Sequence, residues 1–110
     1  MPFIDTSKLT TVEKRPGWFG KHFDSPSMTF GHWEFRGGST IHEHCHPQEE
    51  VWEILEGTLE VTIGDITRIA GAGMVAIVPA NTPHSVKALS DGKAIVVDFP
   101  VRGEIVSANL

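Results

Sequence analysis

The chain has 110 residues and a formal charge of -5, with 40% hydrophobic and 21% charged residues. This length suits a single domain, and the composition is that of a folded globular protein rather than a disordered one. The nine lysines and arginines are scattered along the sequence, so they form no basic patch of the kind that binds nucleic acid.

The single cysteine and the short apolar runs indicate where the protein works. Cys45 has no second cysteine with which to form an internal disulfide, and the N-terminus lacks the basic-then-apolar order of a signal peptide. No apolar run is long enough to cross a bilayer core of roughly 30 Å. We therefore expect a soluble, cytoplasmic protein that binds neither membrane nor nucleic acid.

Residues 1–25 show no clear period and are interrupted by proline and glycine, which predicts an arm with one short strand lying over the body. The arm contains three large aromatic residues with apolar surface to bury. They would anchor the arm or form a subunit contact, a lid over a substrate being the alternative: Trp18, Phe19 and Phe23.

Beyond the arm, β-branched and aromatic runs alternate with turn signals. Gly64-Asp65, between two such runs, has the glycine-first form of a two-residue hairpin turn. No stretch keeps a helical period over three turns. The sequence therefore predicts an all-β barrel or sandwich, with strands near residues 27–35, 40–46, 50–55, 58–63, 66–69, 74–78, 84–88 and 93–99.

Three of the six histidines alternate with other residues in the second of these predicted strands. Because successive side chains of a strand point to opposite faces, His42, His44 and His46 should share one face. Cys45 should then point away from them as a packing thiol. His32, among large apolar residues, is expected to be a hydrogen-bonded structural histidine.

Glu50 begins the next predicted strand, after the break at Pro47, so its carboxylate can turn toward the histidines. If Glu50 faces inward, Trp52 and Ile54 do so as well. Trp52 would then line or floor a pocket.

These residue types have the chemistry of a metal site. A first-row metal needs neutral imidazoles or carboxylates that converge to about 2.0–2.2 Å from one point. His44 and His46 come from one strand, and in a small closed barrel the distant His84 could complete the set with Glu50. Three histidines and one glutamate would leave positions open for substrate or water, as catalytic metal sites do. The alternative is a chain that keeps these residues without a functional metal.

The same segment resembles the first motif of the cupin superfamily. That motif has a glycine, five residues, His-x-His, three or four residues, a glutamate, six residues and a glycine. Here the places are occupied, with every spacing kept, by Gly38, His44, His46, Glu50 and Gly57.

The second cupin motif is also present, with two departures. Gly73, Pro79 and His84 keep their places, while Asn81 replaces a glycine and Ala88 replaces the final asparagine. Asparagine tolerates the left-handed backbone that a glycine would adopt, so the turn at Asn81 should survive.

The resemblance implies a small single-domain cupin of the conserved-barrel (cupin 2) type, with a jelly-roll β-barrel. The predicted division is an arm over 1–25, the barrel over 26–102 and a C-terminal tail over 103–110. The resemblance also implies a homodimer and one divalent transition metal, either zinc, iron, manganese, nickel or copper. The implied ligands are His44, His46, Glu50 and His84.

The segment Asp98-Phe99-Pro100-Val101-Arg102 resembles the ending of the pectin-degradation cupins that linearise unsaturated uronates. By that resemblance, Asp98 would transfer a proton and Arg102 would hold a substrate carboxylate. The alternative is a solvated strand end. His42, which the motif does not require, would either contact the substrate or a ligand, or lie on the rim.

Two functions remain open from the sequence. The first is a metal-dependent enzyme acting on a small oxygen-rich substrate, either an isomerase of a sugar acid or a dioxygenase. The second is a non-catalytic module that binds or senses a metal or small ligand. Cupins include both kinds, so the fold does not choose between them.

Overall fold

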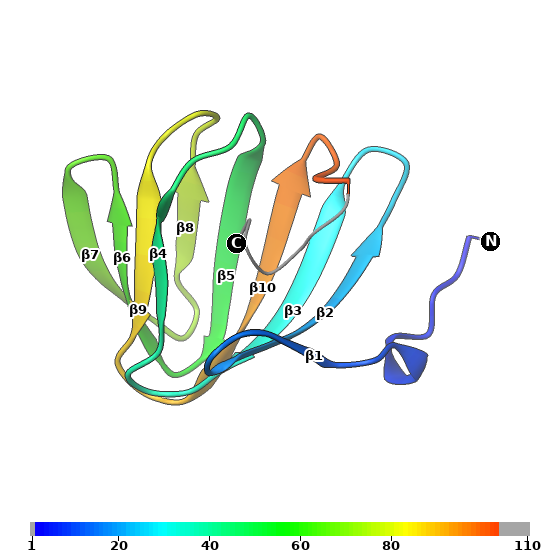
Figure 1. The fold of residues 1–110 in the computed structure, drawn as a ribbon, viewed down its shortest axis with the longest axis horizontal. Helices are drawn as coiled ribbons and strands as arrows, with labels where there is room; N and C mark the ends of the chain where they lie inside the picture. The colour runs from blue at the N-terminus through cyan, green and yellow to red at the C-terminus, as the bar shows by residue number, and fades with distance from the viewer. Residues whose placement is uncertain (1, 104–110) are drawn as a thin grey trace.

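The computed structural model describes residues 2–103, which form ten strands and one short 3-10 helix (Figure 1). The elements are η1 (Thr6–Lys8), β1 (Val12–Arg15), β2 (Trp18–Asp24), β3 (Thr29–Phe35), β4 (Thr40–His44), β5 (Glu49–Glu56), β6 (Thr58–Ile63), β7 (Ile66–Gly71), β8 (Val75–Val78), β9 (His84–Ala88) and β10 (Gly92–Phe99). The predicted all-β architecture is confirmed. No helix in the described part of the chain has the length and hydropathy to span a membrane.

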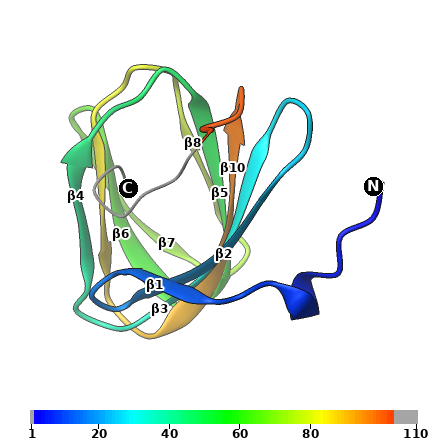
Figure 2. The ribbon, with the colours of Figure 1, turned by 45° about the vertical axis from the view of Figure 1, so that its right-hand side comes forward.

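The strands form two antiparallel sheets that face one another across the interior (Figure 2). The larger sheet has the order β1-β2-β3-β10-β5-β8, and the smaller has the order β4-β9-β6-β7. Strands that are neighbours in a sheet are mostly distant in sequence, as in a jelly roll. Because strands distant in sequence pair in this way, His84 on β9 lies beside His44 on β4.

The core lies between the sheets and follows the alternation of each strand. Trp18, Trp33 and Phe35 fill it from the larger sheet, and Leu59 and Val86 fill it from the smaller one. The Trp18 ring meets the edges of Trp33 and Trp52 in T-shaped contacts with centroids 6.0 and 6.1 Å apart. Aromatic side chains of this size bury about 150–250 Å² each, so these rings supply much of the packing next to the pocket.

The N-terminal region is more regular than the expected arm with one short strand. β1 and β2 are both strands of the larger sheet, and β2 pairs with β3 from Trp18 through Asp24. Trp18 is 0% exposed, so it anchors the region in the core and is not available for a subunit contact or a lid. Phe19 and Phe23 lie on the outer face. The predicted tail lies outside the described residues except for Gly103.

Two turns show why the motif residues occupy their places. Asn81 adopts φ +60°, which confirms that asparagine supplies the left-handed turn in place of glycine. Its N–H donates to the carbonyl of His46 at 2.8 Å and so ties the corner after β8 to the loop after β4. Gly57 has φ +82°, and a Cβ there would collide with the carbonyl oxygen of Asp91. Only glycine fits this corner without strain.

Candidate metal centre

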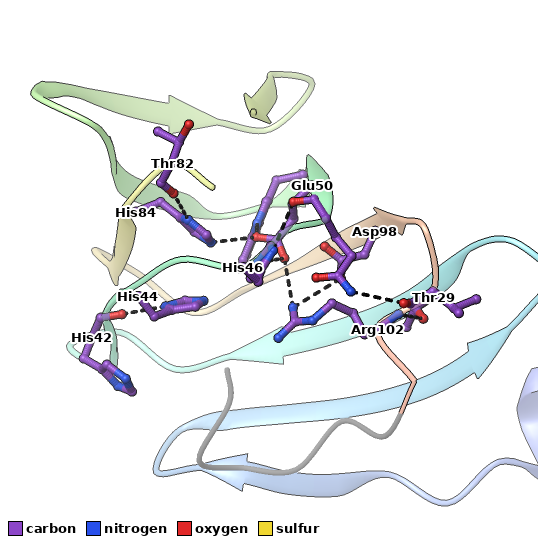
Figure 3. Close-up of polar contacts among 12 residues, drawn as sticks. Thr29, His42, His44, His46, Glu50, Thr82, His84, Asp98 and Arg102 are labelled. Atoms are coloured by element: carbon purple, nitrogen blue, oxygen red, sulfur yellow. Dashed lines mark hydrogen bonds and ion pairs between the residues drawn. The ribbon is translucent and has the colours of Figure 1, made fainter. Parts of the chain in front are cut away.

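Three histidines converge at one mouth of the barrel (Figure 3). His44 ends β4 and His84 begins β9, and as a cross-strand pair their ring centroids lie 4.3 Å apart. His46 lies in the loop after β4, with its ring centroid 5.0 Å from that of His84. One ring nitrogen from each histidine lies within 4.8 Å of the other two. A cluster this tight can hold a metal ion, as the sequence predicted.

His42 does not share the face of the other histidines, so that expectation is wrong. The pairs Ile41↔Val86 and His44↔His84 enclose two residues on β4 but one on β9, which is a β-bulge. The bulge turns both Ile41 and His44 inward although they are three residues apart. His42 is exposed and points away from the cluster (Figure 3).

The backbone fixes the tautomer of all three clustered histidines. Nδ1 of His44 donates to the carbonyl of His42 at 2.8 Å. Nδ1 of His46 donates to the carbonyl of Gln48 at 3.0 Å, and Nδ1 of His84 donates to the carbonyl of Thr82 at 2.8 Å. Because a carbonyl can only accept, each Nδ1 carries the proton and each Nε2 presents a lone pair. The buried Nε2 atoms of His46 and His84 have no hydrogen-bond partner within the described structure. Unpartnered lone pairs, oriented by carbonyls, fit a metal cation.

Glu50 faces these histidines from the opposite sheet. Its carboxylate oxygens lie 3.4 Å from Nε2 of His46 and 3.3 Å from Nε2 of His84. Glu50 is buried, as are Trp52 and Ile54, which confirms the predicted inward set. Trp52 lines the pocket and donates its indole N–H to Glu50 Oε2 at 2.6 Å.

The ionisation of Glu50 and His84 reflects this proximity. Burial raises the pKa of Glu50, but the neighbouring imidazoles of His46 and His84, together with Asp98 and Trp52, outweigh this effect and hold that pKa well below its usual range. Burial lowers the pKa of His84, but Glu50 and the Thr82 carbonyl raise it more. A carboxylate this close to an imidazole favours either a proton on the imidazole or a metal cation between the two groups. Metal binding would therefore compete with protonation.

Arg102 and Asp98 extend the site beyond the ligand cluster. Nη1 of Arg102 lies 3.6 Å from Glu50 Oε1 and 3.6 Å from Asp98 Oδ2. The backbone N–H of Arg102 donates to Thr29 Oγ1 at 2.9 Å, which fixes the chain after β10. Asp98 is 4% exposed, so the alternative of a solvated strand end is wrong.

Asp98 differs from Glu50 in its protonation. Burial and the neighbouring charge of Glu50 raise the pKa of Asp98 to about 9, despite the opposing effect of Arg102. Two carboxyl groups this close cannot both ionise easily, so one proton resides on Asp98. Its Oδ1 is buried without a hydrogen-bond partner within residues 2–103.

The sequence did not predict one titratable residue of the pocket, His22. It faces inward from β2 and lines the pocket with His44, Asp98 and Arg102. Its ring lies 4.9 Å from that of Trp33 and fills space that two glycines leave open. A Cβ on Gly20 or Gly31 would come within 2.8 or 2.9 Å of the ring. The alternation Trp18, Gly20, His22 could have shown this only if β2 had been assigned as a core strand.

His22 is a neutral imidazole in this setting. Burial, together with Lys14 and Arg102, lowers its pKa to about 4. Its Nδ1 is buried and has no hydrogen-bond partner in the described part of the chain.

Two other expectations concern residues outside the pocket. His32 lies half-buried on the outer face of the larger sheet, where its ring meets the Phe23 ring edge-on at 5.5 Å. Cys45 is exposed, so it is not the packing thiol that the sequence predicted.

Two facing antiparallel sheets that enclose three histidines and a glutamate place the chain among jelly-roll proteins with a candidate metal site inside the barrel. The family model of the cupin domain matches residues 31–100, and the chain belongs to this family.

Curated relatives extend the likeness at the level of sequence. The chain is 29% identical over 73 residues to an uncharacterized protein of Streptomyces coelicolor, a match that covers 66% of this chain and 70% of that protein. It is 28% identical over 62 residues to the H2HPP isomerase of Bacillus subtilis. That match covers 56% of this chain but 26% of the isomerase, so it spans about a quarter of the larger protein.

Solved structures share the fold. An RmlC-like cupin from Shewanella frigidimarina superposes with a TM-score of 0.87 at 18% identity, covering 94% of both chains. KdgF from Halomonas sp. superposes with a TM-score of 0.86 at 22% identity, covering 94% of this chain and 96% of KdgF. Oxalate decarboxylase from Bacillus subtilis gives 0.83 at 18% identity, covering 93% of this chain and 30% of that one. At these identities the likeness shows the fold alone.

Proposed function

We propose that this cupin is a metal-dependent enzyme that isomerises a small, oxygen-rich acid such as a uronate. The observation that carries the proposal lies beside the histidine cluster. There the buried guanidinium of Arg102 is 3.6 Å from both Glu50 and Asp98. Proton transfer on a sugar acid requires two groups. One is a cation that binds the substrate carboxylate, and the other is a carboxylic acid that retains its proton. Their presence favours isomerisation over oxygen-dependent cleavage.

The proposed ligands of one divalent transition metal per chain are His44, His46, Glu50 and His84. When bound, such an ion would act as a Lewis acid toward a carbonyl or hydroxyl oxygen. Zinc, iron, manganese, nickel and copper all accept this ligand set. Manganese has support from a structural neighbour, since oxalate decarboxylase is described with Mn(II) centres.

The residues of this chain divide the remaining work. Arg102 would bind the substrate carboxylate, and Asp98 would give or take the proton at the reacting carbon. Trp33 and Trp52 form apolar walls that limit water around these groups. His42 would contribute only through its backbone carbonyl, which orients His44.

One relative supports isomerisation by the name it carries, the H2HPP isomerase. By the resemblance of the 98–102 segment, an unsaturated uronate is the first substrate to test. We also propose that the protein acts in the cytoplasm and as a homodimer.

The test is turnover of an unsaturated uronate by metal-loaded protein, followed by NMR. Asp98→Asn, which keeps the shape but cannot donate or accept the same proton, should lower kcat by about 10²- to 10⁴-fold. Arg102→Lys should mainly raise KM, because a lysine cannot pair bidentately with a carboxylate. A matched control, Asp65→Asn in the exposed β6–β7 turn, should change neither.

Other outcomes would replace the proposal. Oxygen consumption with a diketone or phenol, without uronate turnover, would identify a dioxygenase. Tight binding of small acids with no turnover of any of these compounds would identify a binding or sensor module.

A further inference from the structure

His22 lies deeper in the barrel than the groups proposed for catalysis. Strand register aligns Asp98 with Glu50 in one inward-facing row of the larger sheet. Side chains two residues apart on a strand share a face, so the next row toward the interior faces the same cavity. That row takes one residue from each of four adjacent strands: His22, Gly31, Val96 and Trp52. His22 therefore approaches the pocket from below Asp98.

Two glycines make room for the His22 ring. A Cβ on Gly31 would come within 2.9 Å of Nε2 of His22, and a Cβ on Gly20 would come within 2.8 Å of Cε1. A larger residue at either place would push the ring from its position. Gly31 stands between His22 and Val96 in the row, so its missing side chain lets the imidazole lie over β3 and reach the cavity. Trp33 packs edge-on against the ring, with 4.9 Å between the ring centroids.

The His22 ring is a polar group among large apolar surfaces. The side chains that line this part of the cavity with it are Trp33, Ile41, Trp52, Val86 and Val96. A neutral imidazole has one donor nitrogen and one acceptor nitrogen, and a buried nitrogen without a partner costs free energy. Nδ1 of His22 is buried and has no hydrogen-bond partner among residues 2–103. A ligand that supplies the missing hydrogen bond would remove this cost.

The size of the cavity limits what can reach His22. Its volume is about 20 Å³, which has room for one water-sized group, since a single water requires about 10–15 Å³. A hydroxyl group fits this space, whereas a whole sugar acid does not. The body of the substrate must therefore lie at the mouth, beside Arg102 and the histidine cluster (Figure 3), with one substituent directed inward.

We infer that His22 determines substrate specificity by hydrogen bonding to a hydroxyl group that enters this cavity. The inference rests on the proposed function, because it takes the substrate carboxylate to be bound by Arg102 at the mouth. A hydroxyl group both donates and accepts, which matches a neutral imidazole, and burial keeps the ring neutral at neutral pH by lowering its pKa to about 4. A hydrogen or methyl group in the same place would leave the ring nitrogen unpartnered. The substrate is thus a hydroxy acid, and the analogue that lacks this hydroxyl should be rejected.

The first experiment compares kcat/KM of metal-loaded protein for an unsaturated uronate and for each of its monodeoxy analogues. The wild type should reject one analogue by about 100-fold or more. His22→Phe keeps the contact with Trp33 but cannot hydrogen bond, and it should reduce this preference about tenfold or more. His22→Gln, which keeps a donor and an acceptor, should retain most of the preference, and His32→Phe, outside the pocket, should retain all of it. A purely structural role would lower activity on all compounds alike, so an unchanged preference in His22→Phe would overturn the inference.

A second experiment decides the question if no uronate is turned over or if His22→Phe fails to fold. NMR spectra of the histidine ring nitrogens are recorded for zinc-loaded wild type with glycerate and with propanoate, which is the same acid without hydroxyl groups. The signals of His22 are those missing from His22→Gln. Glycerate should shift these signals and propanoate should not. Such a shift in a protein without turnover would support the hydroxyl contact and refute the isomerase alone. Glycerate that leaves the His22 signals unmoved would overturn the inference.

Discussion

At the scale of single residues, the bare Nε2 atoms of His46 and His84 are the feature most readily tested. Purified wild type expressed with supplementary metal should contain close to one ion per chain by elemental analysis. His46→Ala should remove it, because the remaining ligands cannot complete the shell. His32→Ala, which changes a histidine outside the pocket, should retain the ion. Wild-type protein that stays metal-free after supplementation would refute the metal centre.

Acid should release the ion for the same reason. A histidine binds metal only when it is neutral, so affinity should weaken as the pH falls below about 6. Titrating loaded protein against a colorimetric chelator would follow the release. Retention of the full ion content at pH 4.5 would argue against histidine ligation.

His22 gives a separate prediction about pH and stability. Its pKa is lowered to about 4, so between about pH 4 and 6.5 the unfolded chain binds more protons than the folded one. The stability that His22 contributes is thus complete above pH 6.5 and is lost as the pH falls toward 4. The charged groups that act on its ring are Lys14, His32 and Arg102, which lower its pKa, and Asp24, which raises it.

The measurement is the free energy of unfolding in urea at pH 7 and pH 4.5, with metal removed from both proteins. His22→Phe keeps an aromatic ring against Trp33 but cannot be protonated. It should lose less stability than the wild type on acidification. Equal losses in the two proteins would show that His22 does not carry this dependence.

At the scale of elements, two motif glycines allow the free-energy cost of a left-handed backbone to be measured apart from the cost of a steric clash. Gly38 and Gly57 both have positive φ, but a Cβ on Gly38 meets open space, whereas one on Gly57 meets the backbone at Asp91. Gly38→Ala should cost about 1–2 kcal/mol of unfolding free energy, the penalty for the left-handed conformation. Gly57→Ala should cost about 3 kcal/mol or more, because the corner must also open. Chemical denaturation would rank the two, and equal costs would mean that the corner relaxes freely.

The bulge in β4 is a feature that alternation along the sequence does not predict. Alternation correctly placed Glu50, Trp52 and Ile54 inward on β5 because that strand pairs regularly with β10 near them. The same rule failed for His42, since an extra residue in β4 shifts every side chain beyond it to the other face. Nothing in the local sequence marks the bulge, which depends on register with β9.

At the scale of the whole molecule, the ligand set joins two sheets. His44 and His84 belong to the smaller sheet and Glu50 to the larger, so an ion that all three bind stabilises only the folded arrangement. Metal at 100 times its dissociation constant should add about 2.7 kcal/mol to the unfolding free energy. Thermal denaturation with and without added metal would show this as a rise in Tm. The rise should vanish in His46→Ala, and an equal rise in that variant would indicate binding elsewhere.

The strands and the four proposed ligands could be predicted because both depend on local signals and fixed spacings. The predicted strands from 27–35 onward agree with β3 to β10 to within two residues at each end. What could not be predicted depends on long-range packing. The burial of Trp18, the inward position of His22 and the approach of Arg102 to Glu50 each require knowing which strand lies beside which.

The hydrogen bond from Asn81 to the carbonyl of His46 also bears on how this pocket can be altered. It joins the loop that carries His46 to the loop that precedes His84, so lengthening either loop would displace both side chains at once. That wall of the pocket tolerates few insertions. In the opposite wall, the segment with Arg102 is also joined to the His46 loop, by a hydrogen bond from Gln48 Nε2 to the Val101 carbonyl at 3.1 Å. His22 lies on β2, which pairs with β1 and β3 rather than with the strands next to the ligand loops. Redesign of substrate preference, by selection or in the laboratory, should therefore succeed at His22 first.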